Sequence, residues 1–281
     1  MNRIANITLG VLISIFLLVS CQKEDREILK DPLEEHYKLI DKGDYSLAIE
    51  KLEELSMVDA RPQVRVALAS AYAARAGVRV ENYWGFVVGF KAPLMFVDDL
   101  KMGPTMESLQ RITGQTNGNV NPRDLKSLGE AVNTLAVWDR YQERVEAIPV
   151  IKEPGALQDL QRGVEVLSTV QTPGGRLYRG LLNLILFKSH LMASEALWAG
   201  LRKVAEQVAV GRLEALCQLK LEELMVWLPL ISYHLGEALG DLSVAFPRER
   251  VSLEQARDLL QRISRTISEG AQELQRKRIC P

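Results

Sequence analysis

The chain has 281 residues, 47% of them hydrophobic, and its 35 lysines and arginines are balanced by 36 aspartates and glutamates, which gives a formal charge of −1. This balance excludes nucleic acid as a partner, because nucleic-acid binding relies on clustered positive charge. Three cysteines without a Cys-x-x-Cys pair and three widely separated histidines argue against a metal site. The apolar content suffices for a sizeable core.

The N-terminal segment has the form of an export signal. Arg3 supplies a positive charge, residues 7–19 supply an apolar core, and a small residue, Ser20, precedes Cys21. The whole apolar run, residues 4–19, is shorter than the ~20 residues that a helix needs to cross a bilayer core. A polar stretch, QKEDREILKDP, begins directly after Cys21.

Leu18-Val19-Ser20-Cys21 resembles the lipobox of bacterial lipoproteins. The resemblance implies that residues 1–20 are removed and that Cys21 carries acyl chains such as palmitate, which hold the protein in the bilayer through a polar tether, residues 21–31. Gln22 replaces the aspartate that retains lipoproteins in an inner membrane, so in a cell with two membranes we expect the outer one, facing the periplasm. An uncleaved anchor and an ordinary signal peptide are the alternatives.

Beyond the tether, helix start signals recur along the chain. A capping residue followed by proline, or by a glutamate or glutamine three positions on, is typical of a helix N-terminus. No segment alternates with the period of a strand over a useful length, so an all-α fold is predicted. The start signals are Asp31-Pro32-Leu33-Glu34, Asn121-Pro122, Thr172-Pro173 and Ser252-Leu253-Glu254-Gln255.

The first helices contain one degenerate repeat. KGDYSLAIEKLEELSMVDARPQ, residues 42–63, resembles the tetratricopeptide repeat, with Gly43 at the turn and Ala48 where two helices pack. A shift of 34 residues aligns Gly77 with Gly43, and RVALASAYAARAG then predicts the first helix of a second unit. The resemblance covers residues 32–77. We expect the remaining helices to complete the core without repeating.

An aromatic segment follows this repeat. Five aromatic residues lie within residues 83–96, interleaved with glycines, and Tyr83, Trp84, Phe86 and Phe90 are the candidate surface for a partner or ligand. The alternative is that the segment is buried in the core. Residues 98–121, which are rich in glycine and asparagine, predict a long irregular connection.

The second half of the chain predicts a helical bundle over residues 122–281. Residues 181–187 are apolar almost all round, which indicates a central helix covered by others. An apolar stripe over residues 213–235 predicts one helix with a kink near Pro229. Cys217 and Cys280 could form a disulfide in an oxidising compartment, or remain a buried thiol and a free one.

No catalytic motif is present in the sequence. The acidic pairs are expected on solvated helix faces, and His190 and His234, which follow apolar runs, are expected to be core or boundary residues. We therefore predict no enzymatic activity, no cofactor and no metal. The acidic pairs are Glu34-Glu35, Glu53-Glu54 and Glu222-Glu223.

Residues 32–281 are predicted to be a single helical domain that serves as a protein-interaction scaffold for an envelope protein. ASAYAARAG, residues 69–77, and the overall layout resemble the helical lipoproteins associated with tripartite periplasmic transporters, which implies an association with a transporter. The alternative is a carrier of an apolar small molecule, bound between residues 83–96 and the central helix.

Overall fold

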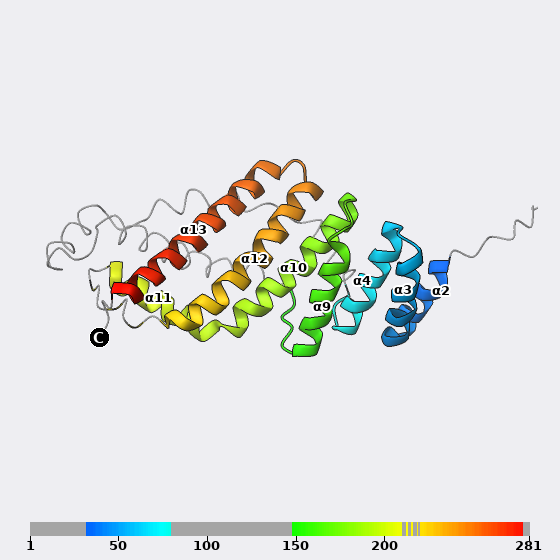
Figure 1. Cartoon of the computed structure of the whole chain (residues 1–281), viewed down its shortest axis with the longest axis horizontal. Helices are drawn as coiled ribbons and strands as arrows, with labels where there is room; N and C mark the ends of the chain where they lie inside the picture. Colours follow the sequence, from blue (N-terminus) through cyan, green and yellow to red (C-terminus); the bar gives the residue numbers. More distant parts are fainter. Residues whose placement is uncertain are drawn as a thin grey trace, which may run out of the picture.

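The computed structural model describes residues 32–79, 148–209, 212, 215, 218 and 220–277. In this part of the chain 83% of residues are helical and none lies in a strand, so the all-α prediction is confirmed. The helices, labelled as in Figure 1, are α2 (Pro32–Lys42), α3 (Tyr45–Val58), α4 (Pro62–Arg75), α9 (Pro154–Leu167), α10 (Pro173–Ala193), α11 (Glu195–Ala209), α12 (Leu221–Ala245) and α13 (Arg250–Lys277).

Four short helices form a row at one end of the molecule. Figure 1 shows α2, α3, α4 and α9 standing side by side, and α4 packs on both α3 and α9. This arrangement requires two buried faces on α4, and its sequence supplies them. Val64, Ala67, Leu68, Ala71 and Tyr72 belong to a core shared with α2 and α3, while Ala69, Ala73 and Ala76 belong to a core shared with α9, α10, α12 and α13.

Two turns with the same backbone conformation end α2 and α4. Gly43 and Gly77 have φ angles of 86° and 82°, a left-handed conformation that favours glycine. Each turn has the paired hydrogen bonds of a Schellman motif. The donor–acceptor residues, with N···O distances of 2.8–3.0 Å, are Gly43–Ile40, Asp44–Leu39, Gly77–Ala74 and Val78–Ala73. Every member of the second set follows its counterpart by 34 residues, as the sequence alignment predicted.

A fourth helix, α9, joins this row after Gly77. α9 packs beside α4 as α3 packs beside α2, although residues 76–153 separate α4 from α9 in the sequence. The two helices approach closely at Gly163, where an added Cβ would lie 3.5 Å from the carbonyl oxygen of Ala69. Small residues thus bring α9 against α4.

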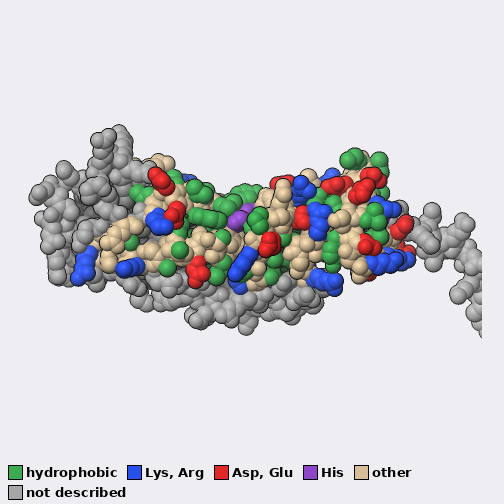
Figure 2. All heavy atoms as spheres, turned by 90° about the horizontal axis from the view of Figure 1, so that it is seen from below, with side chains coloured by type: hydrophobic (Ala, Val, Ile, Leu, Met, Phe, Trp, Pro, Cys, Tyr) green, Lys and Arg blue, Asp and Glu red, His purple; other side chains and the backbone are tan. Residues whose placement is uncertain are grey.

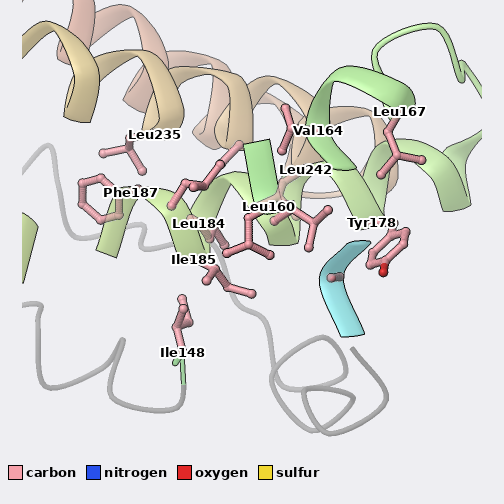
Figure 3. Close-up of a cluster of buried hydrophobic side chains, with 14 of the residues drawn as sticks. Ile148, Leu160, Val164, Leu167, Tyr178, Leu184, Ile185, Phe187, Leu235 and Leu242 are labelled. Carbon is pink, nitrogen blue, oxygen red and sulfur yellow. The ribbon is translucent and has the colours of Figure 1, made fainter. Parts of the chain in front are cut away.

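The longer helices α10, α12 and α13 form the other part of the molecule. α10 starts as predicted at Pro173, and the Thr172 hydroxyl accepts a hydrogen bond from the Gly175 N–H at 3.2 Å. All residues of 181–187 are buried, which confirms the central helix. Figure 3 shows Leu184, Ile185 and Phe187 with the side chains that α9 and α12 contribute to the same core.

Two helix starts differ from their predicted positions. α12 begins at Leu221 rather than at 213, and Lys220 is its N-cap residue. α13 begins at Arg250 rather than Ser252, and the Leu253 N–H already donates to the Glu249 carbonyl. α12 continues through Pro229, which is exposed, and the kink stays a prediction.

Candidate functional site

A row of buried polar groups lies between α10 and α12, which run antiparallel. Its first member is an ion pair between Arg179 and Asp241, with two bonds of 2.6 Å. The side chain of Asp241 is 0% exposed and that of Arg179 is 10% exposed. Arg176 donates a further bond of 2.8 Å to the same carboxylate. Asp241 therefore accepts hydrogen bonds from two guanidinium groups, and the bond from Arg179 raises the pKa of that arginine.

Gly180 allows this ion pair to form at close range. A Cβ added at Gly180 would lie 3.2 Å from the Cβ of Asp241, so the two helix backbones approach closely beside the pair. Burial of two charges is costly unless the geometry and the hydrogen bonds are good. The bidentate contact to Arg179 and the third bond from Arg176 supply both conditions.

An asparagine connects the ion pair to a histidine. Asn183 is 0% exposed, and its amide nitrogen donates to the Arg179 carbonyl at 3.2 Å. Its side-chain oxygen lies 2.9 Å from Nδ1 of His234, which is 1% exposed. An amide oxygen only accepts hydrogen bonds, so Nδ1 of His234 carries the proton.

Aromatic rings complete the row. The His190 ring from α10 stacks on the His234 ring with centroids 5.4 Å apart and planes inclined by 21°. Two aromatic rings of α12 adjoin the stacked pair. The Trp227 ring centroid lies 6.1 Å from that of His190, and the Tyr233 ring meets the His234 ring edge-on with centroids 5.2 Å apart. Burial lowers the pKa of His234 to about 4, with a smaller contribution from His190, and burial also lowers the pKa of His190.

We call this row the polar seam, and its contacts hold α10 and α12 in a fixed register. Within the described ranges, no group of three or more histidine, cysteine, aspartate or glutamate residues is placed to hold a metal ion. The polar seam consists of Arg176, Arg179, Asn183, His190, Trp227, Tyr233, His234 and Asp241.

Polar contacts in the row of short helices lie nearer to its edge. Arg75 of α4 makes two bonds of 2.7 Å to Asp159 of α9, and that hydrogen-bonded contact raises the pKa of Arg75. The Tyr72 hydroxyl donates to Glu53 of α3; burial, followed by this bond, raises the Tyr72 pKa. These part-buried contacts join neighbouring helices of the row.

Large apolar side chains are exposed at both ends of the described structure. Met57 and Val58, adjacent at the end of α3, are 83% and 84% exposed, the highest values among them. Figure 2 shows, from below, hydrophobic side chains among charged ones over the row of short helices. The other large exposed apolar residues are Tyr37, Leu47, Val226, Tyr233, Val244 and Val251.

Most of the residues singled out from the sequence lie outside the described residues, and the predictions made for them stay predictions. They are Cys21, Tyr83, Trp84, Phe86, Phe90, Cys217 and Cys280. Among the described residues, all the glutamates of the three acidic pairs are exposed, as expected. No described helix combines the length and the apolar character needed to span a membrane.

His190 and His234 occupy the positions expected of them, but the sequence did not predict the contact between their rings. His234 is a core residue and His190 a half-buried boundary residue. They are far apart in the sequence, whereas α10 and α12 bring their rings together. A signal was present: each lies in an apolar helix stretch, and a buried imidazole needs a partner.

Comparison of the chain with models of known protein families, with curated proteins and with solved structures gives no match.

Proposed function

We propose that the chain is a membrane-anchored lipoprotein that faces the periplasm, and that its helical row is a scaffold for another envelope protein. The lipobox-like residues 18–21 and the polar tether support the anchor. In a cell with two membranes the proposed location is the outer membrane, because Gln22 follows the cysteine. A transporter component is the partner class that the resemblance of residues 69–77 suggests.

The observation that carries the scaffold proposal is the row of packed helices α2, α3, α4 and α9, the first three of which are joined by short turns. In a row of this kind each helix packs on its neighbours and leaves its outer edges to solvent or to other proteins. Met57 and Val58 place two apolar side chains on such an edge, where folding alone does not require them. We propose that this edge belongs to the partner surface.

The alternative of an apolar-ligand carrier has no specific support in the described part of the chain. The side chains of residues 181–187 pack against those of α9 and α12 (Figure 3), so a ligand at this wall would have to displace protein atoms. The aromatic lining predicted at residues 83–96 lies outside the described residues.

Membrane fractionation tests the anchor. The unchanged chain should be processed and recovered with the membrane, because a lipidated Cys21 becomes its N-terminus. Cys21→Ser should remain unprocessed or leave the membrane fraction, as measured by mass spectrometry of the N-terminus and by blotting. A Cys21→Ser chain that is processed and still membrane-bound would contradict the anchor.

Cross-linking in intact cells tests the scaffold. A photoreactive residue at Leu47 should give a discrete adduct with an envelope protein, and Met57→Glu should weaken that adduct by introducing a charge into the apolar contact. Val251→Glu is the matched control, because Val251 is also exposed, at 67%, but lies on α13. Equal adduct yields in all three chains would contradict a partner surface at the end of α3.

A further inference from the structure

We propose that His190 and His234 form an acid-sensitive contact between α10 and α12, whose protonation separates the two helices at this point while α2, α3 and α4 stay folded. This inference is independent of the proposed function, because it rests only on the packing of the two rings.

The geometry leaves no favourable place for a proton on His234. Its Nδ1 already carries a hydrogen and donates it to Asn183, whose own amide is fixed by the Arg179 carbonyl. A second proton would have to go on Nε2, giving a cation at a site that is 1% exposed. The ring stacked on it, His190, is itself basic, so protonation of both rings would place two like charges 5.4 Å apart.

The charged groups around the pair do not compensate for such a charge. On α12, Asp241 bonds to Arg176 and Arg179, and Glu237 lies 3.5 Å from Arg179. On α10, the ammonium of Lys188 donates to the Ile148 carbonyl.

The other described contacts of the pair involve uncharged side chains. The Tyr233 phenol meets His234 only through its ring edge. The side chains that α9 and α13 contribute to the adjoining core are aliphatic, among them Leu160, Val164, Leu253 and Leu260.

The position of the pair determines which part of the molecule would respond. α12 also carries Leu224 and Leu228, which pack with Leu197 of α11 and Ile267 of α13 in a separate core cluster. Opening at the histidines would therefore loosen α12 together with α11 and α13. The core of α2, α3 and α4 contains no histidine and shares none of these residues.

The direction of the pH effect follows from the His234 pKa, which is about 4 in the folded chain against 6.5 for an ordinary histidine. Between these values the unfolded chain binds more protons, so the folding equilibrium constant falls as the pH drops from about 6.5 to about 4. For one such group, the fall between pH 7 and pH 4.5 is about 50-fold.

The test compares the full chain with His234→Asn. Asparagine keeps an N–H donor close to the position of Nδ1, so the bond to Asn183 is retained, but it does not titrate. The folding constant, measured by urea denaturation, should fall about 50-fold more between pH 7 and pH 4.5 in the unchanged chain than in His234→Asn. His36→Asn, which changes a histidine on α2, should behave as the unchanged chain does. Parallel pH profiles for the unchanged chain and His234→Asn would overturn the proposal.

Hydrogen exchange locates the opening. At pH 4.5, after correction for the intrinsic pH dependence of exchange, amides of α12 should lose protection while those of α4 keep it. Equal loss in both helices would indicate global acid unfolding and would overturn the local opening.

If His234→Asn does not fold, the proposal is tested by an NMR titration of the histidines in the unchanged chain and in His190→Gln. Removal of the neighbouring imidazole should raise the His234 titration midpoint. An ordinary midpoint in the unchanged chain, or no change in His190→Gln, would overturn the proposal.

Discussion

The row of short helices and the α10–α12 pair differ in the residues that form their helix–helix interfaces. α3, α4 and α9 have 14 residues each, and small side chains such as Ala69 let them approach closely. α10 and α12 have 21 and 25 residues, and their interface contains charged and amide groups. The Arg75–Asp159 pair has side-chain exposures of 32% and 13%, against 10% and 0% for Arg179–Asp241.

We infer that the difference reflects register. A long, uniformly apolar interface between two helices could shift by one turn at small cost, whereas a shift would leave Asp241 or Asn183 buried without partners. An unpaired buried charge is strongly destabilising, and an unpaired buried amide costs ~1–3 kcal/mol. Tight turns such as the one at Gly43 fix the register of α2, α3 and α4, so these three helices do not need a buried ion pair.

The largest expected effect comes from removal of the carboxylate of the buried pair. Asp241→Ala leaves Arg179 buried without its counter-charge and should lower the free energy of unfolding by about 3–5 kcal/mol. Asp159→Ala, in the row of short helices, is the matched variant and should cost about 1–2 kcal/mol, because Arg75 can turn to water. Urea denaturation at pH 7 measures both. Equal losses would remove the distinction between the two regions.

A smaller effect is expected from the close approach of α4 and α9. Gly163→Ala would place a Cβ 3.2 Å from Leu182 Cδ1 and 3.5 Å from the Ala69 carbonyl oxygen, so it should cost about 1–3 kcal/mol through overpacking. Gly155→Ala changes a glycine of the same helix that has nothing within 4 Å, and it should be neutral or slightly stabilising. Thermal melts compare the two. A neutral Gly163→Ala would show that α9 is not held by close packing.

The smallest effects test the equivalence of the two turns. Gly43→Ala and Gly77→Ala should each cost about 1–2 kcal/mol, because both positions have positive φ angles and open space around the missing Cβ. The two losses should agree within about 0.5 kcal/mol. A clear difference between them, measured by urea denaturation, would show that the shared backbone conformation does not carry the same strain.

The features that the sequence predicts well are local ones. The start of α10 at Pro173 and the burial of residues 181–187 follow from a cap, a proline and an unbroken apolar run. The 34-residue spacing of Gly43 and Gly77 is equally local, because each turn depends on one residue that tolerates a positive φ. The predicted start of α12 was wrong because the apolar spacing of three and four begins before Leu221, the residue at which the helix starts.

The features that could not be predicted join distant segments. Asn183 and His234 are 51 residues apart, and Arg179 and Asp241 are 62 apart, so no spacing rule connects them. The pairing of α9 with α4 is another example. A repeat search expects the second helix of a unit directly after the first, whereas here the partner follows residues 76–153. The proline that starts α9 was a usable signal, but it did not indicate the neighbour of that helix.

The separation of α4 from α9 also has a consequence for the order of folding. The α3–α4 connection is only residues 59–61, whereas residues 76–153 separate α4 from α9. Contacts within α2, α3 and α4 should therefore form first, as local contacts form faster than distant ones. Until α9 arrives, the alanine face of α4 is uncovered. During synthesis from the N-terminus, this face therefore stays exposed until α9 has been made.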